Sequence, residues 1–381
     1  MMGDVVYDKN HISRASYMKI AIIIDHLRGG GKERRVVELM KGLLTSYSKY
    51  QFIIIMMDGK NADDIAYKYV LDLDIPIYYL GKLNRFQQMK RMSAICKTEK
   101  VDLVHFWAPI KYGYYLAPLH YFSGIPMISS TITSARKQGG NKFWMCKPSY
   151  FLFDKILSNS WQALKINEVP EKKAVCIYNG FDPSRSLIKT SISEIRYCYN
   201  IKTSFIVSMA GEYSYRKDYP LFVNAANRVL AEDPDVTFLA MGSGDPTPYE
   251  SLILPEYRDR IRFVGRVTDV ESVYNASDIV VLATTVEGVS NAIMEGMAIG
   301  KPIVSTKGPY VGTEELVEDG ISGFLAEYHD VEAFAGYILR LLSDPSLRHH
   351  MGKRGKEIVK EKFTIEQMCK GFAKVYDEYE K

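Results

Sequence analysis

The fold class is decided by the stretch from residue 280 to residue 305, which reads VVLATTVEGVSNAIMEGMAIGKPIVS. Its first apolar run, Val280–Ala283, does not alternate with polar residues, which is typical of a strand covered on both faces. A helix is predicted from Asn291 to the Lys301-Pro302 pair, because proline cannot continue it. Ile303–Ser305 reads as the next buried strand. Strand, helix and strand in this order predict a parallel sheet.

Two carboxylates flank the start of this predicted helix. Glu287 falls in the loop after the strand, and Glu295 falls inside the helix, so both are expected at the carboxyl end of the sheet. The backbone N–H groups of Val289, Ser290 and Asn291 lack helical partners and could receive an anion or sugar hydroxyls. The alternative is a surface helix with two solvated glutamates. Small residues on the helix face that must approach the sheet count against it.

This stretch closely resembles the nucleotide-sugar site of the retaining family-4 glycosyltransferases (glycosyl transferases group 1) of GT-B fold. The resemblance covers residues 18 to 381 and is strongest in 205–325. It implies an α/β protein with two Rossmann-like, doubly wound parallel-sheet domains facing across a cleft. It also implies that Glu287 contacts the donor sugar as a catalytic residue and that Glu295 contacts the ribose hydroxyls.

The chain is too long for one ordinary core, so two domains are expected. Residues 1–17 lack periodicity and read as a leader; Met18 is either the true start or a core methionine. We assign residues 18–185 to an acceptor-side domain and 186–362 to a nucleotide-sugar domain, joined by a linker at about 183–199. The resemblance implies that a terminal helix, residues 363–381, crosses back onto the first domain.

A glycine loop follows the first predicted strand, at Gly29-Gly30-Gly31. Such a loop lets the backbone approach a phosphate at the positive end of a helix. A Gly triplet alone is more often a flexible turn. Here residues 30–34 read GGKER and resemble the family's G-G-x-E-R element, which implies that Gly30 and Gly31 approach the donor phosphates.

A second loop, residues 210–218, reads AGEYSYRKD. In the family this loop carries an Arg directly after the glycine and a Lys five residues later, both on the donor diphosphate. Gly211 and Lys217 match that pattern, whereas Glu212 replaces the Arg. Arg216 is the candidate substitute, so Arg216 and Lys217 are predicted to act in catalysis.

The donor base and the acceptor have their own candidate residues. The family's base-binding strand end corresponds to Val264, Gly265 and Arg266. Candidates for the acceptor side fall at predicted strand ends of the first domain: His105, Thr131, Thr133 and Arg136. A structural role for His105 is an equally open reading. Many relatives carry a His where this chain has Ile132 and Thr133, so their acceptor-side chemistry is not carried over.

The charge is unevenly placed along the chain. Residues 1–190 hold 28 Lys/Arg against 16 Asp/Glu, a net +12, and residues 191–381 hold 21 against 29, a net −8. A basic half favours an anionic partner. No nucleic-acid motif accompanies it, so peripheral contact with an anionic inner membrane is the interpretation. Residues 141–151, NKFWMCKPSYF, read either as a partly buried loop helix or as an interfacial contact.

Composition adds expectations about location and cofactors. No apolar run is long enough to cross a bilayer and no signal peptide is visible, so a cytoplasmic chain is predicted. The five cysteines are scattered and never spaced as metal ligands. No DxD-like pair lies at a strand end, so no metal or other cofactor is expected. Cations and backbone N–H groups would then meet the charge of the leaving group.

These residues favour a retaining transferase that moves a hexosyl or N-acetylhexosaminyl group. Its donor would be a nucleotide diphosphate sugar, UDP-linked, and its acceptor a glycan or lipid-linked saccharide in bacterial surface polysaccharide synthesis. Two alternatives stay open. One is a nucleotide-sugar epimerase of GT-B fold, and the other is a protein that binds a nucleotide sugar without turnover, because Glu212 alters the diphosphate loop.

Overall fold

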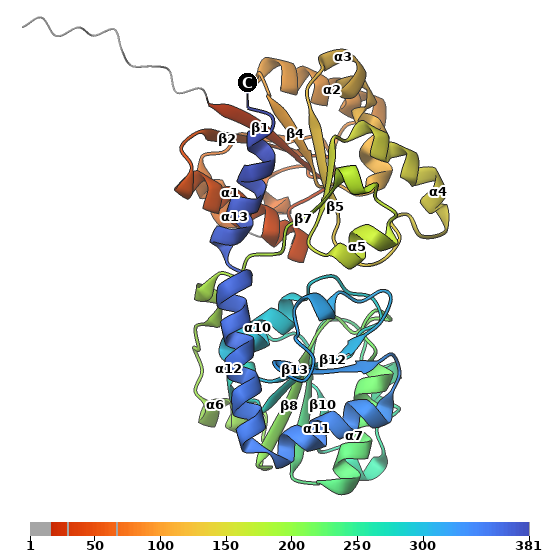
Figure 1. Ribbon diagram of the computed structural model, residues 1–381, viewed down its shortest axis with the longest axis vertical. Coiled ribbons are helices and arrows are strands. Elements are labelled where there is room, and N and C mark those ends of the chain that lie inside the picture. The colour runs from red at the N-terminus through yellow and green to blue at the C-terminus, as the bar shows by residue number, and fades with distance from the viewer. Residues whose placement is uncertain (1–16, 29, 66–67, 381) are drawn as a thin grey trace, which may run out of the picture.

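Two parallel β-sheets, each with helices on both faces, form two stacked domains (Figure 1). The computed structural model describes residues 17–28, 30–65 and 68–380, so most of the predicted leader and Gly29 lie outside the described residues. The first sheet has seven strands in the order β3-β2-β1-β4-β5-β6-β7, and the second has six in the order β10-β9-β8-β11-β12-β13. The predicted pair of doubly wound parallel sheets is confirmed.

The first domain contains the elements up to residue 176. Its strands are β1 (Met18–Ile24), β2 (Tyr50–Met56), β3 (Ile77–Tyr79), β4 (Leu103–Phe106), β5 (Met127–Ile132), β6 (Lys155–Ser158) and β7 (Ala174–Cys176). Its helices are α1 (Gly31–Ser46), α2 (Arg85–Thr98), α3 (Ala117–Ser123), α4 (Phe143–Cys146) and α5 (Trp161–Ile166).

The second domain follows the linker. Its strands are β8 (Phe205–Ala210), β9 (Val236–Met241), β10 (Ile261–Phe263), β11 (Ile279–Leu282), β12 (Ile303–Lys307) and β13 (Gly323–Glu327). Its helices are α6 (Ile192–Cys198), α7 (Tyr219–Glu232), α8 (Thr247–Glu250), α9 (Val270–Ala276), α10 (Asn291–Ile299), α11 (Val331–Ser343) and α12 (Pro345–Lys362).

Strand β1 is the centre of the first core. It pairs in parallel with β2 on one side and with β4 on the other. Because successive side chains of a strand point to opposite faces, Ile20 and Ile22 pack with α1, whereas Ala21 and Ile23 pack on the other face with α2 and α3. Burial on both faces explains the apolar run without alternation.

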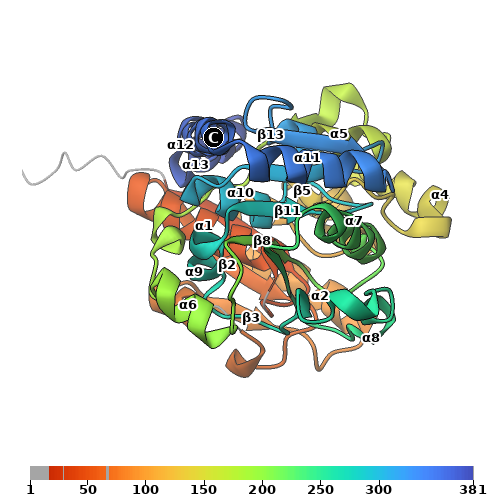
Figure 2. The same cartoon turned by 90° about the horizontal axis from the view of Figure 1, so that it is seen from below.

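The terminal helix α13 (Ile365–Asp377) leaves the second domain and packs on the first. Figure 1 shows α12 running along the lower domain and α13 continuing onto the upper one, and Figure 2 shows both on the same side of the molecule. Phe372 and Tyr376 of α13 are fully buried in the first core. The predicted return of the C-terminal helix is therefore present.

His105 is part of this core and does not reach the acceptor side. It lies inside β4 with no exposed surface. Its Nδ1 is 2.7 Å from the Tyr376 hydroxyl and its Nε2 is 2.8 Å from the Ser130 hydroxyl. Burial lowers the pKa of His105 well below its usual range, so the ring is neutral at physiological pH. The acceptor role predicted for His105 is wrong because strand alternation turns the side chain toward α13.

The segment predicted as a linker contains the helix α6. Ser191 and Glu194 form a capping box at its start, and the helix packs against α9. The S-x-x-E spacing at 191–194 was the available signal for this helix. A second chain crossing lies beside the linker, where the Phe181 N–H donates to the Phe363 carbonyl at 2.8 Å.

Among the described residues, no helix is long and apolar enough to cross a membrane.

Candidate active site

The loop between β11 and α10 lies at the carboxyl edge of the second sheet and faces the first domain. A Cβ on Gly288 would lie 2.9 Å from the Thr133 carbonyl oxygen and 3.1 Å from Asn159 Oδ1. Both contacts come from loops at the carboxyl ends of β5 and β6. Only a glycine allows this approach, so the small residue next to Glu287 brings the two domains together across the cleft.

Glu287 and Lys217 form an ion pair in this cleft. The side chains are 23% and 14% exposed, respectively, so the pair is largely shielded from water. The Lys217 stem crosses Gly211, whose added Cβ would lie 3.2 Å from Lys217 Cγ and Cε. Because Gly211 has no side chain, the Lys217 stem can pass over it and place its ammonium group beside Glu287. The structure brings together these three residues, which the sequence had assigned to one site.

The N-terminus of α10 opens beside this pair. Ser290 is the N-cap and is buried, but its side chain makes no capping hydrogen bond. The N–H groups of the first turn are therefore available to an anion or hydroxyl group, and the helix dipole favours negative charge there. Val289 is buried at 3% exposure and packs in the core of the second domain.

Helix α1 of the first domain begins opposite α10 (Figure 1). A Cβ on Gly31 would lie 3.0 Å from Asn291 Nδ2. The carboxylate of Glu33 folds back over Gly30, where an added Cβ would meet Glu33 Oε2. An anion at the start of α1 would therefore compete with Glu33, whereas the start of α10 has no such side chain.

One group of metal-ligand types lies in the same loop. Ligand atoms of Asp25, His26 and Glu33 lie within 4.8 Å of one another. The Lys32 ammonium group lies 2.5 Å from Asp25 Oδ1 and 3.4 Å from Glu33 Oε1. Because this cation neutralises the carboxylates from within the group, we assign no metal to it.

Glu295 is held by two arginines from outside its own domain. Arg34 of α1 lies 3.5 Å from Glu295 Oε1, and Arg185 of the linker donates to the same oxygen. Burial raises the pKa of Glu295, although both arginines act in the opposite direction. The carboxylate therefore links the second domain to the first domain and to the linker.

Arg185 also approaches Glu38 of α1, with 4.0 Å between Nη1 and Oε1. Burial nevertheless raises the pKa of Glu38 from its usual 4.5 to about 7.

The raised pKa of Glu38 means that the folded state holds the proton more tightly than the unfolded state, so the free energy of unfolding should fall as the pH rises from about 4.5 through 7. Glu38→Gln should remove this fall and raise the free energy of unfolding at pH 8 by about 1–3 kcal/mol. Urea unfolding at pH 5 and pH 8 checks this, with the exposed Glu366→Gln as control. An unchanged pH dependence in Glu38→Gln would contradict it.

Arg216 lies apart from the Lys217–Glu287 pair. It forms an ion pair of 3.2 Å with Glu212, and the two side chains are 48% and 55% exposed. An exposed i,i+4 pair of this kind is weak. Arg216 could therefore turn toward a diphosphate, but it must first leave Glu212.

The predicted base-binding residues follow β10. The Gly265 N–H donates to the Tyr213 hydroxyl at 3.1 Å, and the same hydroxyl donates to the Ala240 carbonyl at 2.9 Å. Tyr213, in the loop after β8, thus links that loop to strand β9 and to the loop after β10. Val264 is partly buried and Arg266 is exposed beside Gly265.

The acceptor-side candidates separate in the structure. Thr131 is buried and accepts a hydrogen bond from the Ser129 hydroxyl at 3.3 Å. Thr133 lies in the cleft against the Gly288 loop. Arg136 is exposed and donates to the Tyr215 hydroxyl of the second domain, with its guanidinium 5.7 Å from the ring centroid. Arg136 and Tyr215 therefore meet across the cleft.

Sequence reasoning missed three residues that organise this region. Arg34 stands in the GGKER element, so its position was visible although its partner was not. Arg185 lies 110 positions before Glu295, and no local pattern marks it. Tyr213 reads as one aromatic residue among several in its loop. Each of these three residues acts through a contact with a residue that is distant in the sequence.

Two Rossmann-like domains that face across a cleft, with a Lys–Glu pair at an open helix start, define a protein of the GT-B class. Comparison with known proteins agrees, because residues 204–344 match the family model of the glycosyl transferases group 1. The match lies within the second domain, which therefore resembles this family.

Its relatives are distant. An uncharacterized glycosyltransferase, MJ1178, of Methanocaldococcus jannaschii is 26% identical over 365 residues, which cover 92% of this chain and 95% of that protein. The N-acetyl-alpha-D-glucosaminyl L-malate synthase of Bacillus anthracis is 27% identical over 210 residues, 54% of each chain, so the match spans about half of that relative. The crystal structure of Anabaena Alr3699/HepE in complex with UDP and glucose shares the fold. Its TM-score is 0.76 at 19% identity, over 95% of this chain and 100% of that chain.

Proposed function

We propose that the protein transfers a sugar from a nucleotide diphosphate sugar to an acceptor hydroxyl, with retention at the anomeric carbon. The observation that carries this proposal is the Lys217–Glu287 pair beside the uncapped start of α10. A cation and free N–H groups suit a diphosphate, and a carboxylate suits sugar hydroxyls. UDP is the nucleotide we propose, because the Anabaena protein of the same fold binds UDP.

In the proposed reaction, the bond between the anomeric carbon and the diphosphate oxygen breaks. A new bond forms to the acceptor oxygen on the same face of the sugar, and the acceptor proton passes to a phosphate oxygen of the leaving group. Lys217 and the first turn of α10 would stabilise the charge that grows on the diphosphate. Glu287 would bind the sugar, and Glu295 would bind the ribose.

This charge stabilisation is proposed to need no metal. Lys217 and the α10 N–H groups would supply the positive potential that a metal ion supplies elsewhere. Turnover should therefore persist after treatment with a chelator. Activity that disappears with the chelator and returns with Mg²⁺ would reject this part of the proposal.

The acceptor is proposed to be a glycan or lipid-linked saccharide, reached from the cytoplasmic face of the membrane. Incubation of the protein with UDP-sugars and a lipid extract tests the function. A transferase releases UDP only when acceptor is present, and NMR of the product reports the anomeric configuration. An epimerase would change the sugar and free little UDP, and a binding protein would do neither.

Membrane contact is the proposed reason for the charge of the first half. Helix α4 and the following turn expose Trp144, Met145 and Phe151 at 73%, 48% and 57%, among lysines. Such an aromatic and basic surface suits an anionic bilayer.

We expect liposome flotation to show binding to anionic vesicles that fades with salt, because the Debye length is about 8 Å at physiological ionic strength. Trp144→Ser should weaken this binding several-fold, since it removes the largest exposed apolar group of α4. Tyr197→Ser is the control, because Tyr197 is 87% exposed on α6 of the acidic half. No flotation at low salt, or equal losses in both variants, would contradict membrane contact through α4.

A further inference from the structure

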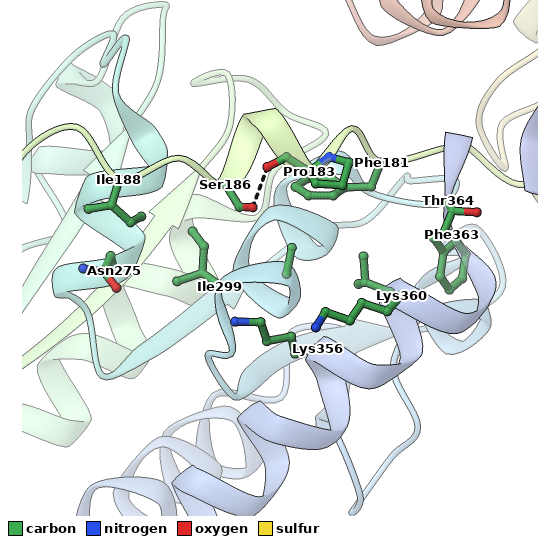
Figure 3. A pocket seen from close by; sticks show the side chains of 12 residues that line it. Phe181, Pro183, Ser186, Ile188, Asn275, Ile299, Lys356, Lys360, Phe363 and Thr364 are labelled. Carbon is green, nitrogen blue, oxygen red and sulfur yellow. Dashed lines mark hydrogen bonds between the residues drawn. The ribbon is translucent and has the colours of Figure 1, made fainter. Parts of the chain in front are cut away.

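A pocket of about 300 Å³ lies beside the two chain crossings between the domains, and we call it the hinge pocket (Figure 3). Lys217 and Glu287 are not among the residues that line it. Its walls come from the linker, from the ends of α9 and α10, and from the end of α12. Both chain crossings between the domains line this pocket. The first crossing, at the start of the linker, contributes Phe181 and Pro183, and the second, between α12 and α13, contributes Phe363 and Thr364. A hydrogen bond from Phe181 to Phe363 joins the crossings.

The floor of this hinge pocket is apolar. Phe181, Val359 and Phe363 are buried at 4%, 4% and 1% exposure. Ile188 contributes a side chain that is 41% exposed, and Ile299 is partly exposed. Apolar side chains that remain partly open to solvent around a concave surface would gain from an apolar ligand.

Two ammonium groups stand at the mouth of the pocket. Lys356 and Lys360 are exposed and extend from one face of α12 along the side of the pocket opposite the linker (Figure 3). They are four residues apart, so their like charges repel on the helix surface. Two other cations of α12 are paired, because Arg354 contacts Glu318 and Glu357, and Lys362 contacts Glu318.

Lys356 and Lys360 make no ion pair with any described residue. None of the described residues that line the pocket is acidic. An anion between the two lysines would relieve their repulsion and find no carboxylate opposing it. A ligand that carries both an anionic group and an apolar chain would therefore complement the two lysines and the apolar floor of the pocket.

We propose that the hinge pocket binds an anionic amphiphile, of the class of a short alkyl chain that carries a phosphate group. The chain would cover the floor around Phe181 and Phe363, and the phosphate would lie between Lys356 and Lys360. Because both crossings form the walls, the occupant would touch every covalent connection between the domains.

Calorimetry with octyl phosphate below its micelle concentration tests this site. We expect one molecule bound per chain, and binding weaker by about tenfold or more for octyl glucoside, which lacks the charge, and for inorganic phosphate, which lacks the chain. K356Q/K360Q should weaken octyl phosphate binding by about tenfold. The matched variant K370Q/K374Q removes two exposed lysines with the same spacing on α13 and should bind like the wild type.

Ile188→Glu gives a second test, since it places a carboxylate on the wall opposite the lysines and should also weaken octyl phosphate binding. Vesicles with phosphatidic acid, compared across the same variants, separate a bilayer lipid from a free ligand of this class. Equal losses in the two lysine pairs would overturn the proposal. So would a K356Q/K360Q protein that melts at a lower temperature yet keeps its affinity, because the lysines would then only offset the carbonyl end of α10.

Discussion

Lys217→Ala should lower kcat by about 10²–10³-fold, which is the typical effect of removing one group that stabilises a developing oxyanion. Lys217 is the cation that the structure places at the carboxyl edge of the second sheet, with its stem across Gly211 and its ammonium group on Glu287. The charge on the leaving diphosphate grows during the reaction, so the loss should fall mainly on kcat. Rates of UDP release at saturating donor measure it.

Arg216→Ala is the comparison for this variant. Arg216 precedes Lys217 but is half exposed and paired with Glu212, so we expect a smaller loss of turnover. Lys217→Arg should restore part of the rate, because it keeps the charge. If Lys217→Ala retained turnover while Arg216→Ala lost it, the diphosphate would be held by the outer cation and our assignment would be wrong.

Glu295→Gln should weaken donor binding by about 10- to 150-fold, because a hydrogen bond to a charged group contributes about 1.5–3 kcal/mol. The carboxylate is 13% exposed and already meets Arg34 and Arg185, so its orientation is fixed before a ribose arrives. Calorimetry with UDP measures the change in affinity.

The arginine contacts require a control, since Glu295→Gln also weakens a link between the domains. A nucleotide without ribose hydroxyls, 2′,3′-dideoxy-UDP, should bind the wild type and the variant almost equally. If the variant lost as much affinity for the dideoxy nucleotide as for UDP, Glu295 would act through the domain arrangement and not through the ribose.

The sequence predicted most of the sheet architecture because parallel strands buried on both faces leave short apolar runs, rich in β-branched residues and bounded by turn residues. Elements at the edges were harder to predict. Strand β3, Ile77–Tyr79, has three partly exposed residues and no such run. Helix α6 has one buried residue, Ile195, so its apolar periodicity is weak and only its capping box marks it.

In the candidate site, too, some features follow from the local sequence and others only from the tertiary structure. Local sequence determined that Glu287 follows a strand, that Glu295 sits inside a helix and that glycines stand at positions 211 and 288, because spacing along one chain segment sets these relations. Only the tertiary structure decided which charges meet. Arg185 and Glu295 are 110 positions apart, and the ion pair exists because the linker passes the face of α10 that carries the carboxylate. His105 was assigned to the cleft from its place near a strand end, but the return of α13 over that face buries it against Tyr376. Packing between segments that are distant in sequence determines burial and charge pairing, and no local pattern encodes it.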